Sequence, residues 1–116
     1  MKWFKRSEFA CKCECGFDTV DYELVKVMDE VREHFEQPVT INSGCRCEAH
    51  NAKVGGAKNS VHKTGQACDF RVKNVHADIV ADYLVAMYPN KYGIGRYNGR
   101  THVDVKSGPA RRWDSR

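Results

Sequence analysis

The sequence predicts an α+β fold in which a small, mainly antiparallel sheet packs against two helices. Two segments, 22–36 and 75–87, repeat apolar residues at helical spacing. Other short stretches alternate apolar and polar residues, as half-buried strands do. The dipeptide Asn98-Gly99 separates two of these stretches and is a strong hairpin signal. The 116 residues suffice for one domain, which we place at 1–116.

The two helices have recognisable ends. The first begins after Asp21, an N-cap residue, and Pro38 ends it. Its apolar stripe consists of Leu24, Met28, Val31 and Phe35. The second is predicted to be capped by Asn74 and to end before Pro89. Its buried stripe is predicted to consist of Val75, Ile79, Tyr83, Leu84 and Met87.

Four strands are predicted, at 39–41, 67–72, 92–97 and 101–105. The first two are connected by a turn at 42–44, a short helix at 47–53 and a surface loop at 54–65. In the second strand the alternation directs Cys68 and Phe70 to the core. It places Asp69 and Arg71 on the opposite face.

One aspartate and two histidines are the residues from which an open catalytic zinc site is built, with a fourth position left for water. Alternation in the last strand places His102 and Asp104 on its polar face. If that strand lies beside 67–72, Asp69 joins them, with His62 above the cluster on its loop. Taken singly, either histidine would be an ordinary surface residue and Asp69 an ion-pair partner. Their conjunction predicts a zinc site on the sheet face.

The chain has six cysteines, and five of them form two groups. Cys11, Cys13 and Cys15 would converge on one partner if their segment is extended, and Cys45 and Cys47 would do the same. Neither group has the two-residue gap of a zinc knuckle. Three interpretations therefore stay open: reduced thiols packed as small hydrophobes, disulfides, or a second metal site.

A motif between residues 60 and 69 resembles the zinc D-alanyl-D-alanine carboxypeptidase family of peptidoglycan peptidases, which includes phage endolysins. The pattern Ser-x-His-x-x-Gly-x-Ala-x-Asp is met by Ser60, His62, Gly65, Ala67 and Asp69. Further segments that resemble the family lie at 41–46, 93–97, 102–104 and 112–113. The resemblance covers most of the chain and implies the hedgehog-type zinc peptidase fold.

The resemblance also implies roles for individual residues. Zinc would be bound by His62, Asp69 and His102. Arg46 would bind the substrate or stabilise the developing oxyanion, which suits a planar, permanently charged side chain. Ser60 matches a serine near the substrate, and its alternative role is to cap the turn. The implied substrates are peptidoglycan stem peptides, cut next to a D-amino acid by a carboxypeptidase or an endopeptidase.

The position of the general base departs from the family pattern. Many members place an acidic residue three positions before the second histidine, where this chain has Gly99. Asp104 shares a strand face with His102 and is the predicted replacement. Two other roles stay open for Asp104, namely orienting His102 and binding the metal itself.

Two other classes of function compete with a peptidase. The hedgehog signalling domain shares this zinc site and fold, so a non-catalytic binding domain is the alternative that the missing acid favours. A small nucleic-acid-binding protein would draw on the net charge of +4, but the basic residues are spread along the sequence. We therefore expect no nucleic-acid partner, no membrane partner and a monomer.

The N-terminal stretch is basic and lacks the apolar core of a secretory signal. We therefore expect synthesis in the cytoplasm followed by action on the bacterial cell wall. The short chain is most similar to phage members of the family, which predicts a phage or prophage gene.

Overall fold

The five strands in the described part of the chain form one sheet in the order β1-β2-β4-β3-β5. The structure, a computed structural model, describes residues 2–116. The strands are β1 Val39–Ser43, β2 Ala67–Val72, β3 Gly93–Tyr97, β4 Arg100–Asp104 and β5 Arg111–Asp114. The helices are α1 Tyr22–Phe35, α2 Glu48–Lys53 and α3 Ala77–Met87, with 3-10 turns η1 Arg6–Phe9 and η2 Val61–Thr64. The predicted α+β class is confirmed.

The first helix, α1, agrees with its prediction. The carboxylate of Asp21 accepts a hydrogen bond from the Glu23 N–H at 2.8 Å, as an N-cap does. Glu36 ends the helix in the left-handed conformation, with Pro38 just beyond it. The predicted stripe faces the core: Leu24, Met28 and Val31 are fully buried, and Phe35 packs at its edge.

The second predicted helix, α3, differs in its start and in its buried face. Asn74 does not cap it but lies in a turn with a left-handed φ of 63°. His76 is the cap, and its Nδ1 accepts a hydrogen bond from the Asp78 N–H at 3.1 Å. The buried residues are Val80, Ala81 and Leu84, whereas the predicted Ile79 and Met87 are exposed. Apolar residues surround much of this helix, so periodicity alone does not identify the face that packs.

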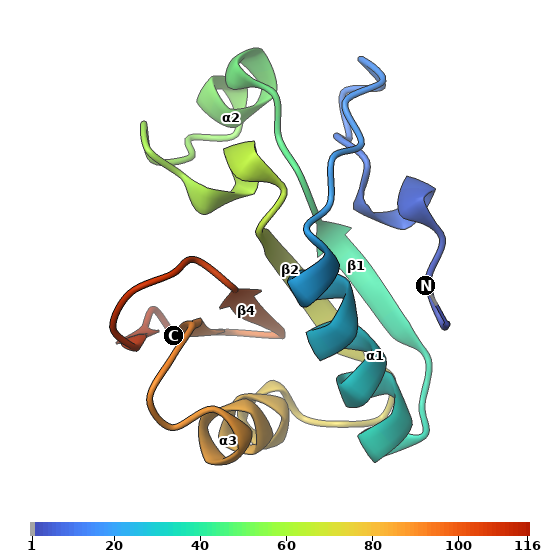
Figure 1. Cartoon of the computed structure of the whole chain (residues 1–116), viewed down its shortest axis with the longest axis vertical. Coiled ribbons are helices and arrows are strands. Elements are labelled where there is room, and N and C mark those ends of the chain that lie inside the picture. Colours follow the sequence, from blue (N-terminus) through green and yellow to red (C-terminus); the bar gives the residue numbers. More distant parts are fainter. Residues whose placement is uncertain (1) are drawn as a thin grey trace.

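Both long helices pack against the same face of the sheet. Figure 1 shows α1 lying across β1 and β2, with α3 below β4. Phe70 of β2 and Val103 of β4 point into this core, as the alternation predicts. The core also takes in Val72, Val105, Ile94 and the buried helix residues. Asp69 and His102, which alternate with the core residues, therefore point to the opposite face.

The sheet has one strand more than predicted. β5, at the sheet edge, pairs in parallel with β3, while the other three strand pairs are antiparallel. The prediction treated this segment only as a family motif, because three of its four residues are charged. Its backbone is nevertheless held to β3, for example by the Arg111 N–H on the Tyr92 carbonyl at 2.9 Å.

The N-terminal segment packs beside the start of the loop that follows β1. The Cys45 N–H donates to the Phe9 carbonyl at 2.8 Å. Gly44 permits this approach, since a Cβ there would overlap the Phe9 backbone. Residues far apart in sequence are thereby brought to one end of the sheet.

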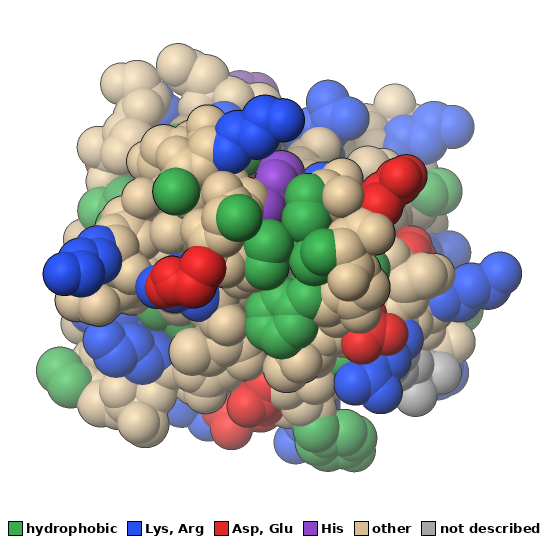
Figure 2. Space-filling view, turned by 90° about the horizontal axis from the view of Figure 1, so that it is seen from above, with side chains coloured by type: hydrophobic (Ala, Val, Ile, Leu, Met, Phe, Trp, Pro, Cys, Tyr) green, Lys and Arg blue, Asp and Glu red, His purple; other side chains and the backbone are tan. Residues whose placement is uncertain are grey.

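None of the helices within residues 2–116 has the length and apolar character needed to span a bilayer. Lys and Arg side chains alternate with acidic ones on the face shown in Figure 2. On this face the basic side chains form no continuous stripe.

Candidate metal centre

Two rows of directly paired residues cross the sheet on the face away from the core. The first row consists of Asp69, His102, Gly95 and Trp113, on β2, β4, β3 and β5. A Cβ at Gly95 would overlap the indole ring of Trp113. Because Gly95 has none, the indole lies over it and approaches the His102 ring, with 4.9 Å between the ring centroids. The row therefore places an aspartate, a histidine and a tryptophan side by side.

The second row has the same construction. It consists of Ala67, Asp104, Gly93 and Arg111. A Cβ at Gly93 would overlap the Asp104 carboxylate. Arg111 reaches across this glycine and donates from Nη2 to Asp104 Oδ1. The two glycines of the 93–95 segment thus provide the space in which the polar side chains of both rows meet.

His62 reaches the sheet from η2 and not, as predicted, from an open loop. Ser60 caps this 3-10 turn: its Oγ accepts a hydrogen bond from the His62 N–H at 3.3 Å. Gly65 ends the turn with a left-handed φ of 74°, and a Cβ there would overlap the Thr19 carbonyl. The turn holds the His62 ring in a buried position, 4% exposed.

The ligand atoms of His62, Asp69 and His102 all lie within 4.8 Å of one another. Asp69 is central, with Oδ2 3.4 Å from His62 Nε2 and Oδ1 2.9 Å from His102 Nδ1. His62 Nδ1 donates to the Gly44 carbonyl at 2.7 Å, which leaves the lone pair of neutral His62 on Nε2. The structure therefore brings the three predicted ligands together.

His102 shows the complementary arrangement. Its Nε2 donates to Asp104 Oδ2 at 2.9 Å, so the lone pair of the neutral ring is on Nδ1 and faces Asp69. A nitrogen lone pair and a carboxylate oxygen at this distance need a proton or a metal cation between them. Two imidazoles and one carboxylate, all buried, are a donor set that suits zinc, so these residues fit that ion.

The charged groups of the site shift one another's pKa values towards the ionised forms. Burial lowers the pKa of His102, but Asp104 and Asp69 raise it above its ordinary value. Burial raises the pKa of Asp69, but the His102 and His62 rings, when protonated on the nitrogens that face it, hold it well below its usual range. Asp104 behaves likewise: burial opposes its ionisation, while His102 and Arg111 lower its pKa. Both carboxylates are therefore ionised at neutral pH, the state in which they attract a cation.

Asp104 is completely buried, and both of its oxygens are engaged. Oδ2 accepts from His102, while Oδ1 accepts from Arg111 and from the Lys106 N–H, the latter at 3.2 Å. The candidate ligands whose atoms all lie within 4.8 Å of one another are His62, Asp69 and His102; Asp104 is not among them. These contacts correspond to the orienting role, one of the three that the sequence left open.

Arg46 lies beside the centre. Its Nη2 is 3.6 Å from Asp69 Oδ2, its Nε donates to Ser43 Oγ at 3.1 Å, and its Nη1 donates to Asn51 Oδ1 at 3.3 Å. It lines a groove over the three ligands together with Ser60, Arg100, Lys106 and Arg111. Asp69 and Asp104 are the only carboxylates among the described residues that line the groove, so its walls are predominantly basic.

A model of the peptidase M15 family matches residues 2–104. The chain belongs to the peptidase M15 family. M15 peptidases are metallopeptidases, so the family that the motif indicated is confirmed.

Curated M15 relatives include the peptidoglycan L,D-endopeptidase MepK of Escherichia coli K12, of Escherichia coli O157:H7 and of Shigella flexneri. Each is 32% identical to this M15 chain over 82 residues. The matches cover 66% of this chain and 44% of each relative. The chain thus spans less than half the length of the curated relatives it matches.

The sequence analysis did not predict two polar residues that contact Arg46 and Asp104 at the M15 site. Asn51 is buried and connects Arg46 to the Ala57 carbonyl, to which its Nδ2 donates at 2.8 Å. The only feature of the sequence that could have pointed to Asn51 was its position on the predicted short helix, one turn after Cys47. Arg111, the partner of Asp104, carried no signal, because the strand pairing that brings it there is not local in sequence.

Proposed function

We propose that this M15 chain is a zinc peptidase that hydrolyses peptide bonds next to D-amino acids in bacterial peptidoglycan. The observation that carries the proposal is the buried set of His62, Asp69 and His102 at the floor of an open groove. Membership of a metallopeptidase family supports it. The similarity to MepK, whose name is that of a peptidoglycan L,D-endopeptidase, supports the substrate class.

Zinc bound by these three residues would supply Lewis acidity, which lowers the pKa of a bound water and polarises a carbonyl. The protein holds the ligands in place before binding: Gly44 orients the His62 ring and Asp104 orients the His102 ring. Arg46 presents a permanently charged guanidinium next to Asp69, held by Ser43 and Asn51. We assign it to binding the substrate carbonyl or the negative charge that develops there.

For Asp104 we propose positioning of His102 rather than the general-base role. A base needs a carboxylate oxygen within reach of the attacking water. Both Asp104 oxygens instead accept hydrogen bonds from the protein. A carboxylate behind a ligating histidine fixes the ring and raises its basicity, and this is the geometry seen here. Ser60, which caps the turn of His62, is assigned the same kind of supporting role.

The charge of the groove supports an anionic substrate. Arg46, Arg100, Lys106 and Arg111 line it, and a bound zinc ion would add to their charge. Peptidoglycan stem peptides carry free carboxylates, so we propose that these basic side chains bind them. Between the two modes left open by the sequence, the similarity to an L,D-endopeptidase favours cleavage within stem peptides or cross-links over removal of a terminal D-alanine.

The test is incubation of the zinc-loaded protein with three defined substrates: muropeptides with L,D cross-links, muropeptides with D,D cross-links, and uncross-linked pentapeptides. Mass spectrometry then identifies the bond that is cut. We expect cleavage next to a D-amino acid, abolished by a chelator and restored by zinc. Cleavage that persists without zinc would overturn the mechanism.

The second candidate is a non-catalytic zinc-binding domain of the same fold. The observation that favours it concerns Asp104, the one groove carboxylate in residues 2–116 that is not a candidate ligand: both of its oxygens accept hydrogen bonds from the protein, and Gly99 stands at the usual acid position. Failure to cut any of the three substrates, combined with zinc-dependent retention on isolated cell walls, would establish this function in place of the peptidase.

A further inference from the structure

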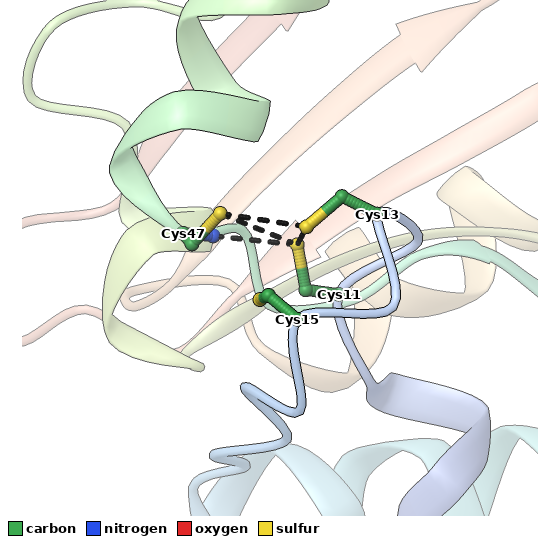
Figure 3. A group of neighbouring side chains, drawn as sticks. All are labelled: Cys11, Cys13, Cys15 and Cys47. Atoms are coloured by element: carbon green, nitrogen blue, oxygen red, sulfur yellow. Dashed lines mark hydrogen bonds between the residues drawn. The ribbon is translucent and has the colours of Figure 1, made fainter.

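A second group of potential metal ligands lies outside the groove, where the N-terminal loop meets the start of α2. It consists of Cys11, Cys13, Cys15 and Cys47, whose sulfur atoms all lie within 4.8 Å of one another. Figure 3 shows the thiols of Cys11, Cys13 and Cys47 directed toward one another, with Cys15 beside them. We call this group the cysteine cluster.

The cluster forms because the N-terminal loop folds back on itself. The Cys11 N–H donates to the Phe17 carbonyl at 2.7 Å, and the Glu14 N–H donates to the Cys11 carbonyl at 3.2 Å. Glu14, between Cys13 and Cys15, and Gly16, directly after Cys15, adopt left-handed conformations as the chain turns back. The segment that carries these cysteines is therefore not extended, as the prediction assumed, but the three thiols do lie close together.

Cys45 and Cys47 do not converge on one partner, as the sequence had suggested. Only Cys47 joins the cluster; the Cys45 thiol is buried and donates to the Phe17 carbonyl at 3.0 Å. Cys68 lies fully buried in the core on β2. Four of the six cysteines thus share one site, and the other two have separate environments.

The spacing of three of the sulfur atoms matches one face of the tetrahedron around a single ion, and the Cys15 sulfur lies within 4.8 Å of each of them. The distances are 3.4 Å from Cys11 to Cys13, 3.8 Å from Cys11 to Cys47 and 3.6 Å from Cys13 to Cys47. A zinc–sulfur bond of about 2.3 Å gives a tetrahedron with edges of about 3.8 Å. Such edges are too long for disulfide bonds, at about 2.0 Å. The thiols are thus arranged around a common centre rather than in bonded pairs.

Backbone N–H groups are also directed at the sulfur atoms. The Cys47 N–H points to Cys11 Sγ at 3.5 Å, and the His50 N–H points to Cys47 Sγ at 3.4 Å. Such hydrogen bonds stabilise negatively charged thiolates around a metal and orient them. Reduced thiols packed as small hydrophobes do not require these donors, and two of the four side chains, Cys13 and Cys15, are exposed to solvent.

We propose that Cys11, Cys13, Cys15 and Cys47 bind a second, structural zinc ion. Four thiolates in a tetrahedral arrangement close the coordination shell, so the site leaves no position for water or substrate. Its effect is mechanical. The ion connects the N-terminal loop to Cys47, which directly follows Arg46 in the sequence. The backbone N–H of Arg46 donates to the His62 carbonyl at 2.9 Å. The ion thereby stabilises the segment that carries Arg46 into the groove.

The test compares zinc content among variants purified under reducing conditions. Wild type should hold about 2 zinc ions per chain, and Cys13→Ser/Cys15→Ser should hold about 1, with a lower melting temperature. Both replaced side chains are exposed, so the metal-free fold tolerates the change. Cobalt substitution adds a spectroscopic signature: a thiolate-to-metal charge-transfer band in wild type that the double variant lacks.

Two controls separate this proposal from the peptidase function. Cys68→Ala removes a thiol outside the cluster and should keep both ions and the charge-transfer band. His62→Ala should lose the groove ion and keep the band. Zinc content in Cys13→Ser/Cys15→Ser equal to that of wild type, or disulfides among the four cysteines in freshly purified wild type, would overturn the proposal whether or not the protein cuts peptidoglycan.

Discussion

The metal centre on the sheet and the cysteine cluster both gather ligands from distant parts of the chain, but different forces hold the two groups together. At the metal centre, Asp69 and His102 are directly paired residues of neighbouring strands, and His62 is held by a capped turn. The cysteine cluster instead joins an irregular loop to the start of a short helix. Backbone pairing positions the first group, whereas the second has only a few loop hydrogen bonds.

This difference predicts a different dependence on metal. A site built on strands keeps its geometry without an ion, because ladder hydrogen bonds and the core fix the backbone. A site built on loops gains most of its order when the ion binds, so its binding free energy becomes folding free energy. We therefore assign chemistry to the sheet site and stability to the cysteine cluster.

The largest expected effect comes from His62→Ala. Loss of a ligand should abolish zinc binding in the groove and lower turnover of the substrate by about a thousandfold, since a metal Lewis acid contributes several kcal/mol to catalysis. The melting temperature should change little compared with that of Cys13→Ser/Cys15→Ser. Zinc analysis, muropeptide cleavage and calorimetry measure the three quantities. A large loss of melting temperature in His62→Ala would contradict the division between chemistry and stability.

Arg46 lies between the two regions: it precedes Cys47 in the sequence, and its side chain lines the groove. Its replacement therefore tests whether the groove can lose activity while both metal sites stay intact. Arg46→Ala should lower kcat/KM by about a hundredfold, the usual cost of one oxyanion donor, with both zinc ions retained. Arg46→Lys keeps the charge but not the planar fork, and should recover part of the loss. Steady-state kinetics on the cleaved muropeptide provides the measurement, and unchanged kinetics in Arg46→Ala would remove this residue from the site.

Asp104→Asn distinguishes a positioning residue from a general base. We expect zinc affinity in the groove to fall by about 10-fold to 100-fold, the range for loss of a carboxylate behind a ligating histidine. At saturating zinc, most activity should return, and the acidic limb of the pH profile should remain. If zinc affinity is normal but turnover and the acidic limb are lost, Asp104 is the base instead. Competition with a chromogenic chelator measures the affinity.

Gly95→Ala tests whether the glycine rows build the sheet site. The new methyl group would overlap the Trp113 indole and displace it from the His102 ring. Overpacking of this kind costs about 1–3 kcal/mol of unfolding free energy. Gly99→Ala, at a turn where nothing lies within 4 Å of a new Cβ, is a control for the strain of a left-handed backbone alone. Because Gly95 has no left-handed φ, urea unfolding of the two variants compares the cost of crowding in Gly95→Ala with the cost of backbone strain in Gly99→Ala.

The smallest effect is expected for Ser60→Ala. Its hydroxyl caps the turn of His62, and loss of such a cap costs about 1 kcal/mol. If this is its only role, KM should stay unchanged while the unfolding free energy falls. A several-fold rise in KM at unchanged stability would instead support the substrate contact that the family resemblance implies.

The sequence predicted that the three candidate ligands lie together, and the structure brings their ligand atoms within 4.8 Å of one another. This proximity was predictable because the residues lie on regular elements or in a short motif. Alternation in the two central strands placed Asp69 and His102 on one face, and the core face is as predicted. The predicted α3 stripe was right for Leu84, Val75 and Tyr83, which pack in or against the core, and wrong for Ile79 and Met87, because apolar residues occupy several faces of that helix. Supporting residues such as Asn51 and Arg111 were missed, since their partners are distant in sequence. The single domain and the phage origin stay predictions.

By itself, the sequence determined the α+β class, the family, and which three residues are the candidate ligands in the groove, because these depend on local periodicity and on a compact motif. The tertiary structure alone decided that Asp104 faces His102 and Arg111, and that Cys47 rather than Cys45 joins the N-terminal cysteines. The physical reason is that strand register and loop closure are properties of the whole fold. They bring together residues whose spacing in the sequence carries no sign of contact.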